Sequence, residues 1–431
     1  MELTDIAVIA VFVVAYGACS ARLSRTVVTP PMVFVAFGIV MGPEALGVLE
    51  LSIDQEAVRI LAEATLVLVL FSDAARIDLR VLRRQAQLPA RLLGIGLPLT
   101  IAAGGLTSAV LFGGLEIWEA MLVGVILAPT DAALGQVVVV SERIPIRIRQ
   151  TLNVESGLND GIALPVITLF LALAAVEEEI QSTSFWVEFV LEQIGYGVLV
   201  GVVVGYVGGR VIDLSSRRGW IDGTFQQLST LAVGVAAYAL AVGVDGNGFI
   251  AAFVAGITFG SVARATCHGI YDFTEEEGQL LALLTFLVFG ATIAGPALGE
   301  LTWQIAVYAA LSLTVVRMLP VAISLLGSRL HRDSVLFVGW FGPRGLASIL
   351  FGLLVLEEVA LAGRNEVFLV VTWTVLVSVY AHGLSALPGV RWYGARYEEM
   401  AEEHDEMPEA MEVEAMPTRI GPTRASPPRA P

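Results

Sequence analysis

The sequence predicts an all-α polytopic membrane protein with about 13 transmembrane helices. Hydrophobic residues make up 56% of the 431-residue chain and charged residues only 15%, whereas a soluble chain carries about 25% charged residues. Apolar stretches of about 17–25 residues, long enough for a helix to cross a bilayer, recur along the chain. Two of these stretches contain a proline close to a charged residue, which predicts two helices that are broken within the membrane.

Breaks rich in charge, glycine or proline divide the apolar stretches into thirteen expected spans. The second span is the weakest, because Pro30, Pro31 and a Met-Gly-Pro-Glu segment constrain its two ends. The seventh carries glycines at four-residue spacing from Gly197 to Gly209, which we interpret as a face for close helix packing. The spans are expected near residues 3–21, 27–48, 57–74, 91–113, 117–140, 150–176, 186–209, 226–244, 247–263, 279–298, 301–327, 334–356 and 366–387.

Arginine is distributed unevenly between the connecting loops. The odd-numbered loops and the start of the tail carry eighteen arginines, whereas the even-numbered loops carry only Arg59 and Arg364. Cytoplasmic loops are enriched in positive residues. We therefore expect a multi-pass protein of the plasma membrane, with its N-terminus outside the cell and its C-terminus in the cytoplasm.

The chain is expected to divide into a transmembrane domain, residues 1–390, and a cytoplasmic tail, residues 391–431. From Glu398 to Glu414 the tail is rich in acidic residues and has no arginine or lysine, and its end is rich in proline. This composition predicts disorder. The acidic start of the chain indicates the beginning of the first span rather than a cleaved signal peptide. Two cysteines, Cys19 and Cys267, suggest neither a disulfide framework nor a zinc site.

The fifth and twelfth spans are the two that are interrupted at mid-depth. The fifth contains Pro129-Thr130-Asp131 and the twelfth contains Pro343-Arg344. With the seventh span as a linker, the others form two inverted six-helix repeats, and the fifth span of each repeat is the broken one. Paired interrupted helices of this kind mark the binding site of transporters. Asp131 and Arg344 can compensate the dipoles of the facing half-helices.

Charged side chains at or near membrane depth are costly to insert and are usually functional. Asp160 is followed by a segment without charge, from Gly161 to Val176. Glu155 and Asn159 are four residues apart, as are Ser156 and Asp160, so these four side chains crowd one side of the sixth helix. The full charged set is Glu63, Asp73, Asp131, Glu155, Asp160, Arg317 and Arg344.

An oxygen cluster of Asp160, Ser156, Asp73 and the free carbonyls around Thr130 would suit a hard cation such as Na⁺. Burial favours the protonated form of a carboxylate, so Asp160 is expected to bind either a proton or a cation. Such competition predicts an antiporter, and a single exchanging carboxylate predicts electroneutral exchange. The expected partners are Na⁺, with K⁺ or Li⁺ as alternatives, together with H⁺ and the lipid bilayer. We expect no cofactor, no nucleic-acid partner and no enzyme activity.

The Glu-Ser-Gly-Leu-Asn-Asp-Gly segment at residues 155–161 and the Pro-Thr-Asp segment at 129–131 together resemble a known family. This is the family of monovalent cation:proton antiporters that includes NhaP and the eukaryotic sodium/proton exchangers. The resemblance covers about residues 5–390. It implies the NhaA/NhaP-like fold with crossed broken helices, a homodimer, and movement of a six-helix transport bundle against a dimerisation domain.

The resemblance implies that Asp160 carries both the proton and the transported cation. Ser156, the Thr130 carbonyl and Asp73 would be further cation ligands, and Asn159 would tie the sixth helix to the unwound segments. The acid on the third span is often glutamate in the family, whereas this chain has Asp73. This departure leaves the details of coordination and the choice between Na⁺ and K⁺ open.

The same resemblance implies that Glu155 pairs with Arg317 and that Arg344 lies at the second crossing. Asp131 is expected to cap a half-helix or to bind the cation. The family often has Asp-Pro after the threonine, whereas here Asp131 is followed by alanine and the proline precedes the threonine.

Other functions fit the sequence less well. An intramembrane aspartyl protease needs Gly-x-Gly-Asp and Tyr-Asp contexts, which Asp160 and Asp131 lack. A K⁺/H⁺ antiporter stays open, as does a sodium-coupled solute symporter on a related fold, although no obvious set of solute-recognition groups is present. No nucleotide-binding loop supports a primary pump. Glu63 is expected at the interface or in helix pairing, and His382 is expected at the interface.

Overall fold

The computed structural model describes most of the chain. Cys267 and the tail beyond residue 411 lie outside the described residues, so the expectations for them stay predictions. All regular elements in the described part are helical. The described residues are 3–49, 55–77, 79–80, 82, 87–131, 134–175, 191–263, 280–357, 361–403 and 407–411.

Each of the thirteen expected spans contains a described helix. Helices of the first half are α1 (Leu3–Leu23), α2 (Pro30–Met41), α3 (Gln55–Ala75), α5 (Gln87–Arg91) continuing through η1 (Leu92–Gly96) into α6 (Leu97–Leu111), α7 (Ile117–Ile126), α8 (Gln136–Val140) and α9 (Ile146–Ala175). Then come η2 (Leu191–Tyr196), α11 (Gly197–Arg217), α12 (Gly223–Val242), α13 (Gly248–Val262), and a helix over 280–300 that includes η3 (Phe289–Ala294), α15 (Gly295–Ala297) and η4 (Leu298–Glu300). The last are α16 (Trp303–Leu313), α17 (Val315–Ser324), α18 (Arg332–Trp340), α19 (Leu346–Glu357), α20 (Arg364–Glu403) and η5 (Pro408–Ala410).

Helices long and apolar enough to cross a membrane number eight among the described residues. Four further apolar helices, α2, α7, α13 and α19, are shorter. Two of the shorter ones, α7 and α19, belong to the interrupted spans, so their length follows from the predicted breaks. The fold class expected from the sequence, an all-α polytopic protein with two broken helices, is confirmed.

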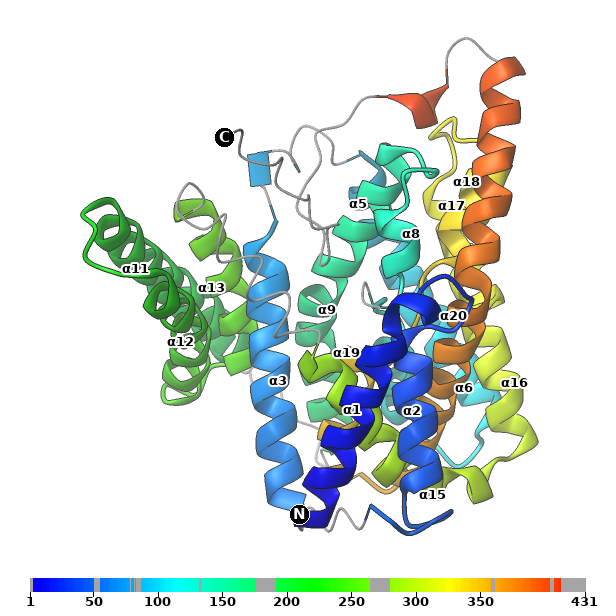
Figure 1. Cartoon of the computed structure of the whole chain (residues 1–431), viewed down its shortest axis with the longest axis horizontal. Coiled ribbons are helices and arrows are strands. Elements are labelled where there is room, and N and C mark those ends of the chain that lie inside the picture. Colours follow the sequence, from blue (N-terminus) through cyan, green and yellow to red (C-terminus); the bar gives the residue numbers. More distant parts are fainter. Residues whose placement is uncertain are drawn as a thin grey trace.

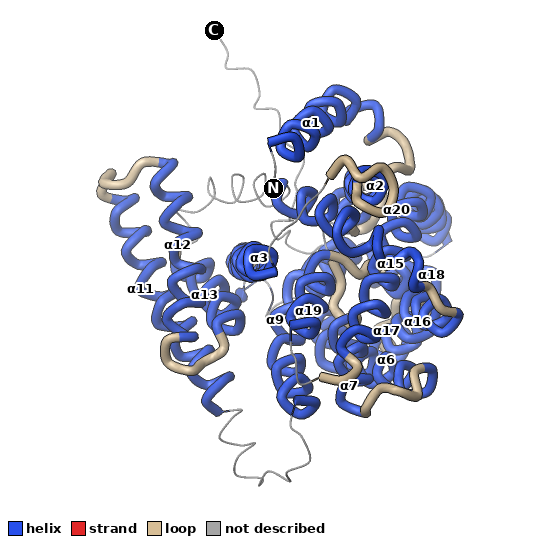
Figure 2. Tube along the Cα trace, turned by 90° about the horizontal axis from the view of Figure 1, so that it is seen from below, coloured by secondary structure: helices blue, strands red, loops and turns tan. Residues whose placement is uncertain are grey.

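The helix α3 stands between two groups of helices (Figures 1 and 2). Helices α11, α12 and α13 lie on one side of it, and the bundle that contains α6, α7, α9 and α16–α20 lies on the other. The glycine stripe of α11 faces α13: a Cβ at Gly201 would lie 2.6 Å from the Ala251 carbonyl oxygen, and one at Gly205 would lie 2.5 Å from that of Ala255. The predicted packing role of this stripe is therefore confirmed.

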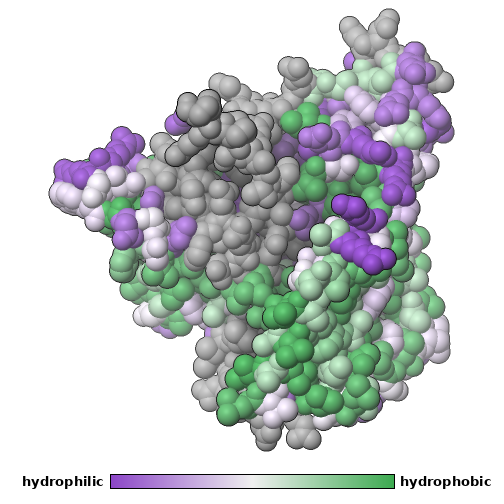
Figure 3. All heavy atoms as spheres, viewed as in Figure 1, coloured by the Kyte–Doolittle hydropathy of each residue, from purple (hydrophilic) through white to green (hydrophobic). Residues whose placement is uncertain are grey.

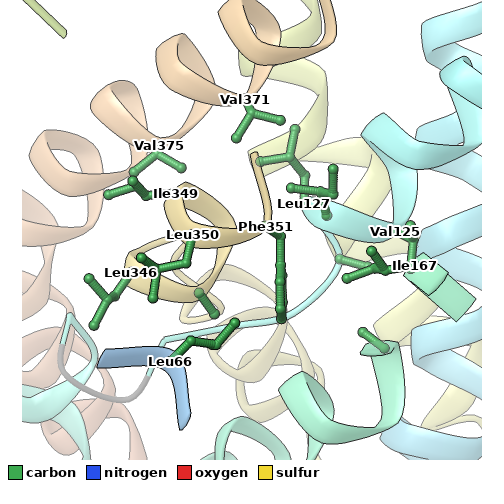
Figure 4. Close-up of a cluster of buried hydrophobic side chains, with 14 of the residues drawn as sticks. Leu66, Val125, Leu127, Ile167, Leu346, Ile349, Leu350, Phe351, Val371 and Val375 are labelled. Atoms are coloured by element: carbon green, nitrogen blue, oxygen red, sulfur yellow. The ribbon is translucent and has the colours of Figure 1, made fainter. Parts of the chain in front are cut away.

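Apolar side chains from both sequence halves meet around α19 (Figure 4). Leu350 and Phe351 of α19 are buried beside Val371 of α20, Val125 of α7 and Ile167 of α9. Because lipid is as apolar as these side chains, close packing rather than escape from water holds such helices together. The second broken span is thus embedded in helices of the first repeat.

The last helix is longer than expected. The sequence predicts a span over 366–387 and a disordered tail from residue 391, but α20 continues to Glu403, so the expected disorder does not hold for residues 391–403. Residues 407–411 also pack on the bundle, where buried Glu409 accepts hydrogen bonds from the His331 N–H and the Ser334 hydroxyl, each at 2.7 Å. Acidic composition predicted solvation, whereas these two donors satisfy the Glu409 carboxylate inside the protein.

Hydropathy differs along the long direction of α20 (Figure 3). Hydrophobic residues cover the lower and middle part of this face, and hydrophilic residues gather toward its upper edge near the C-terminal end of α20. The N-terminus lies at the opposite, lower end of the molecule (Figure 1). The start of α1 and the C-terminal end of α20 therefore lie at opposite ends of the apolar part, as an odd number of spans requires.

Candidate functional site

Helix α9 presents the polar residues of the sixth span in one block. It runs without interruption from Ile146 to Ala175, although Pro165 lies inside it. Glu155, Ser156 and Asn159 are buried, and Asp160 is half-buried. The four-residue periodicity predicted from the sequence therefore places three polar groups inside the protein next to a carboxylate that keeps some access.

Thr130, in the first break, is held by two side chains of α9. The Ser156 hydroxyl donates to the Thr130 carbonyl oxygen at 2.6 Å. The Asn159 amide donates to the Thr130 hydroxyl oxygen at 2.8 Å. A carbonyl oxygen has two lone pairs, so the Thr130 carbonyl can accept this bond and still face a cation. The break thus brings Thr130 oxygens to the helix that carries Asp160.

The two breaks cross through backbone contacts at Asp131. Its N–H donates to the Pro343 carbonyl oxygen at 2.8 Å, and its carboxylate accepts the Leu346 N–H at 2.8 Å. Leu346 is the first residue of α19, so Asp131 caps this half-helix and its negative charge offsets the positive end of the dipole. A Cβ at Gly345 would overlap the Asp131 carboxylate, so the close approach requires glycine there.

A second hydrogen bond joins α19 to the C-terminal end of α7. The Ser348 hydroxyl of α19 donates to the carbonyl oxygen of Ile126, the last residue of α7, at 2.8 Å. This carbonyl belongs to the four that have no partner within their own helix at a C-terminus. Asp131 of the first break therefore satisfies the start of α19, and Ser348 of α19 satisfies the end of α7.

Charged residues flank the crossing. The Arg317 guanidinium contacts the Glu155 carboxylate at 2.6 Å, and both side chains are buried, so the ion pair implied by the resemblance is present. Arg344 is also fully buried and donates to the Gly342 carbonyl oxygen at 2.5 Å within its own break. Its charge lies close enough to Glu155 and Arg317 to interact with both.

Helix α3 carries two acidic residues of the predicted charged set, Glu63 and Asp73. The Tyr238 hydroxyl of α12 donates to the Glu63 carboxylate at 3.1 Å, in agreement with the expected role of Glu63 in helix pairing. Asp73 is half-buried in the last turn of α3, beside the buried Arg76. The role of Asp73 as a cation ligand stays a prediction.

Two polar residues of α20, which the sequence did not predict as site residues, lie at the second break. The Ser378 hydroxyl accepts the Arg344 N–H at 2.7 Å. The His382 ring contacts the Trp340 carbonyl oxygen through Nε2 at 2.9 Å. The expected interfacial position of His382 is wrong, since its side chain is 1% exposed. The four-residue spacing of Ser378 and His382 was the available signal, and it did not reveal which segment they face.

Crossed half-helices beside a buried polar cluster are typical of secondary transporters. Comparison with protein families agrees: the model of the sodium/hydrogen exchanger family, transmembrane part, matches residues 8–392. The chain belongs to this family. The resemblance drawn from residues 129–131 and 155–161 is thereby confirmed.

Relatives with assigned activities fall in the same group. A protein of Alkalimonas amylolytica named K(+)/H(+) antiporter NhaP is 27% identical over 399 residues, covering 91% of this chain and 67% of the relative. A Na(+)/H(+) antiporter of Schizosaccharomyces pombe is 25% identical over 362 residues, covering 73% of this chain and 76% of the relative. The chain spans about two thirds of the length of the bacterial relatives. For a protein of Shewanella baltica named K(+)/H(+) antiporter NhaP2, it covers 64% of that length.

A solved structure shares the fold. The sodium proton antiporter MjNhaP1 from Methanocaldococcus jannaschii, determined at pH 8, matches with a TM-score of 0.72 at 20% sequence identity. The match covers 91% of this chain and 97% of that protein. The arrangement of the helices is therefore that of an antiporter of this family.

Proposed function

We propose that the protein is a secondary-active monovalent cation/proton antiporter in which Na⁺ and H⁺ compete for Asp160. The observation that carries this proposal is the anchoring of Thr130 to α9 by Ser156 and Asn159, at 2.6 and 2.8 Å. It sets hydroxyl and carbonyl oxygens, the ligands that hard cations prefer, next to an ionisable carboxylate. Asp73 is proposed as a further ligand.

The charge balance supports exchange of one cation for one proton. Asn159, the neighbour of Asp160, is uncharged, and Glu155 is paired with Arg317 at 2.6 Å. Asp160 is therefore proposed as the exchanging carboxylate. A site neutralised by either ion crosses an apolar environment more cheaply than an empty carboxylate does. Because each loaded state carries the same charge, the exchange is electroneutral.

The choice of cation has a second candidate. The name of the Alkalimonas amylolytica relative specifies K⁺, whereas the Schizosaccharomyces pombe relative is named for Na⁺. Asp73 is one methylene shorter than the glutamate that the family often has at this position, so the coordination of the cation need not match that of relatives with glutamate. K⁺/H⁺ exchange is therefore the alternative to Na⁺/H⁺ exchange.

The charge distribution and the family support a proposal for the membrane, the orientation and the oligomeric state of the protein. We place it in the plasma membrane as a homodimer, with the N-terminus outside and the arginine-rich loops in the cytoplasm. The division into a six-helix transport bundle and a dimerisation domain is part of the same proposal. The gathering of α11–α13 on one side of α3 and of the main bundle on the other supports it (Figure 2).

Vesicles with an internal pH dye test the proposal directly. Purified protein is reconstituted, a pH gradient is imposed, and Na⁺, K⁺ or Li⁺ is added. The cation that is transported should collapse the gradient in wild-type vesicles and fail to do so with Asp160→Asn. No response to any of the three cations, or full activity of Asp160→Asn, would overturn the proposal. The signal of a membrane-potential dye in the same vesicles should stay constant if the exchange is electroneutral.

A further inference from the structure

The second break leaves backbone groups that a continuous helix would have paired. Helix α18 ends at Trp340 and α19 begins at Leu346, so the carbonyl of Trp340 lies at a helix end and the N–H of Arg344 lies within the break. The Trp340 carbonyl oxygen accepts the Gly342 N–H at 2.8 Å and has a second lone pair to offer, whereas the Arg344 N–H needs a partner from outside the break when it is buried. In the membrane, where water is scarce, an unpaired backbone group is more costly still.

Helix α20 supplies partners for both groups from one face. Ser378 accepts the Arg344 N–H at 2.7 Å, and His382 Nε2 donates to the Trp340 carbonyl oxygen at 2.9 Å. The two side chains are linked to each other, since His382 Nδ1 is 3.1 Å from the Ser378 hydroxyl. Nδ1 also lies 3.0 Å from the Ser378 carbonyl oxygen. This nitrogen has a partner whether or not it carries a proton, so the ring orientation is fixed on both sides.

The Ser378–His382 pair therefore spans the break, from the end of α18 to the residues before α19. Both side chains are almost completely buried, at 0% and 1% exposure. The break itself is bonded to the first break, because Asp131 donates to the Pro343 carbonyl oxygen and accepts the Leu346 N–H. Asp131 follows Thr130, the residue that Ser156 and Asn159 hold next to Asp160.

We propose that Ser378 and His382 are positioning residues for cation binding, which set the register of the second break and, through Asp131, the placement of the Thr130 oxygens. This inference rests on the proposed cation exchange at Asp160. Neither residue touches the cation; they act through hydrogen bonds to the second break and through the backbone of the two breaks. Hydrogen-bonded supports of this kind hold the groups that bind an ion in their productive geometry.

Ser385 offers a matched control on the same face of α20. Its hydroxyl accepts the Trp340 indole N–H at 2.9 Å and donates to the Ala381 carbonyl oxygen of its own helix at 2.7 Å, so Ser385→Ala removes a hydrogen bond to α18 of similar length. That bond goes to a side chain and not to either backbone end of the break. Ser385→Ala should therefore leave the register of the second break unchanged.

The test compares cation-dependent proton exchange by wild type, Ser378→Ala, His382→Gln and Ser385→Ala in vesicles. Loss of a partner for a buried backbone group should raise the cation KM about tenfold in Ser378→Ala, with a maximal rate within about twofold of wild type. His382→Gln keeps an amide donor for the Trp340 carbonyl and loses the link to Ser378, so a smaller rise of about threefold is expected. Ser385→Ala should keep the wild-type KM.

Two results would overturn the inference: wild-type KM values in both Ser378→Ala and His382→Gln, or an equal rise in Ser385→Ala. If Ser378→Ala does not accumulate, His382→Gln alone decides between these outcomes. A parallel measurement of the melting temperature of each purified variant with and without cation separates binding from transport, and cation stabilisation should weaken with the KM. Absence of exchange in wild type would instead count against the proposed function.

Discussion

Three charged residues close to the crossing, Glu155, Arg317 and Arg344, are buried together. Arg317 and Glu155 are in contact at 2.6 Å, and the charge of Arg344 interacts with both. The group therefore holds two positive charges and one negative charge. An uncompensated buried charge is strongly destabilising, so the two members of the ion pair should differ in what their removal costs.

Glu155→Gln should destabilise the protein more than Arg317→Met. The first change removes the carboxylate that pairs with Arg317 and leaves the buried Arg317 and Arg344 guanidinium groups close to each other, at a cost of about 3–5 kcal/mol. The second leaves Glu155 with Arg344 as a nearby opposite charge, so its cost should be smaller. Thermal unfolding of the purified variants in detergent measures the difference. Equal losses, or a greater loss for Arg317→Met, would contradict this account of the charges.

Much of the site could be predicted at this scale because local spacing determines which residues share a helix face. Glu155, Ser156, Asn159 and Asp160 lie on one helix, and their four-residue spacing was enough to place them together. Ser378 and His382 have the same spacing, but what they face depends on how α20 lies against a break some 40 residues earlier in the chain. Sequence spacing within one helix carries no information on that register.

At the scale of elements, small residues determine how closely the helices approach. A Cβ at Gly201 of α11 would lie 2.6 Å from a backbone oxygen of α13, and one at Gly205 would lie 2.5 Å from another. Backbone atoms cannot move aside as a flexible side chain can. The contact between α11 and α13 therefore depends on the absence of side chains, as expected for small residues at membrane-helix interfaces.

Gly201→Ala should force α11 away from α13 and cost about 1–3 kcal/mol, the usual range for overpacking. Gly195→Ala is the matched control, because a Cβ at Gly195 meets no heavy atom within 4 Å among the described residues. Melting temperatures of the two variants in detergent should differ accordingly. A Gly201→Ala protein as stable as the control would show that the interface tolerates separation.

The helix pattern itself was predictable because a bilayer requires long apolar helices, and a proline in such a helix requires a partner for the freed backbone. The length of α20 was not predictable in this way. Its last turns, up to Glu403, are acidic, and composition alone predicts solvation there. The docking of Glu409 on His331 and Ser334 depends on donors from another part of the chain.

At the scale of the whole molecule, contacts between α9 and α13 join the main bundle to the group formed by α11, α12 and α13. The ring of Phe253 on α13 packs against Gly161, the residue after Asp160, where a Cβ would overlap it. Farther along α9, the Asn247 amide at the start of α13 donates to the Thr168 hydroxyl at 3.0 Å. Both contacts lie on the C-terminal side of Asp160 along α9.

In the proposed exchange, alternating access requires the contacts between α9 and α13 to open. Cysteines at Thr168 and Asn247, in a chain whose native cysteines are replaced by serine, should stop exchange when bridged by a short reducible thiol crosslinker. Reduction should restore it. A pair at Gln193 and Asp245, which are joined by a 3.0 Å hydrogen bond beside α11 and α13, should be harmless when bridged. Unchanged exchange with Thr168 bridged to Asn247 would contradict movement between these two groups of helices.

The central claim is that one carboxylate, Asp160, holds either a cation or a proton. The direct measurement is calorimetric cation binding to the purified protein over a series of pH values and in buffers of different ionisation enthalpy. We predict release of up to one proton for each cation bound, and a cation Kd that rises about tenfold for each unit of pH decrease below the titration of the site. Cation binding without proton release and with a Kd independent of pH, or unaltered proton release in Asp160→Asn, would contradict the account.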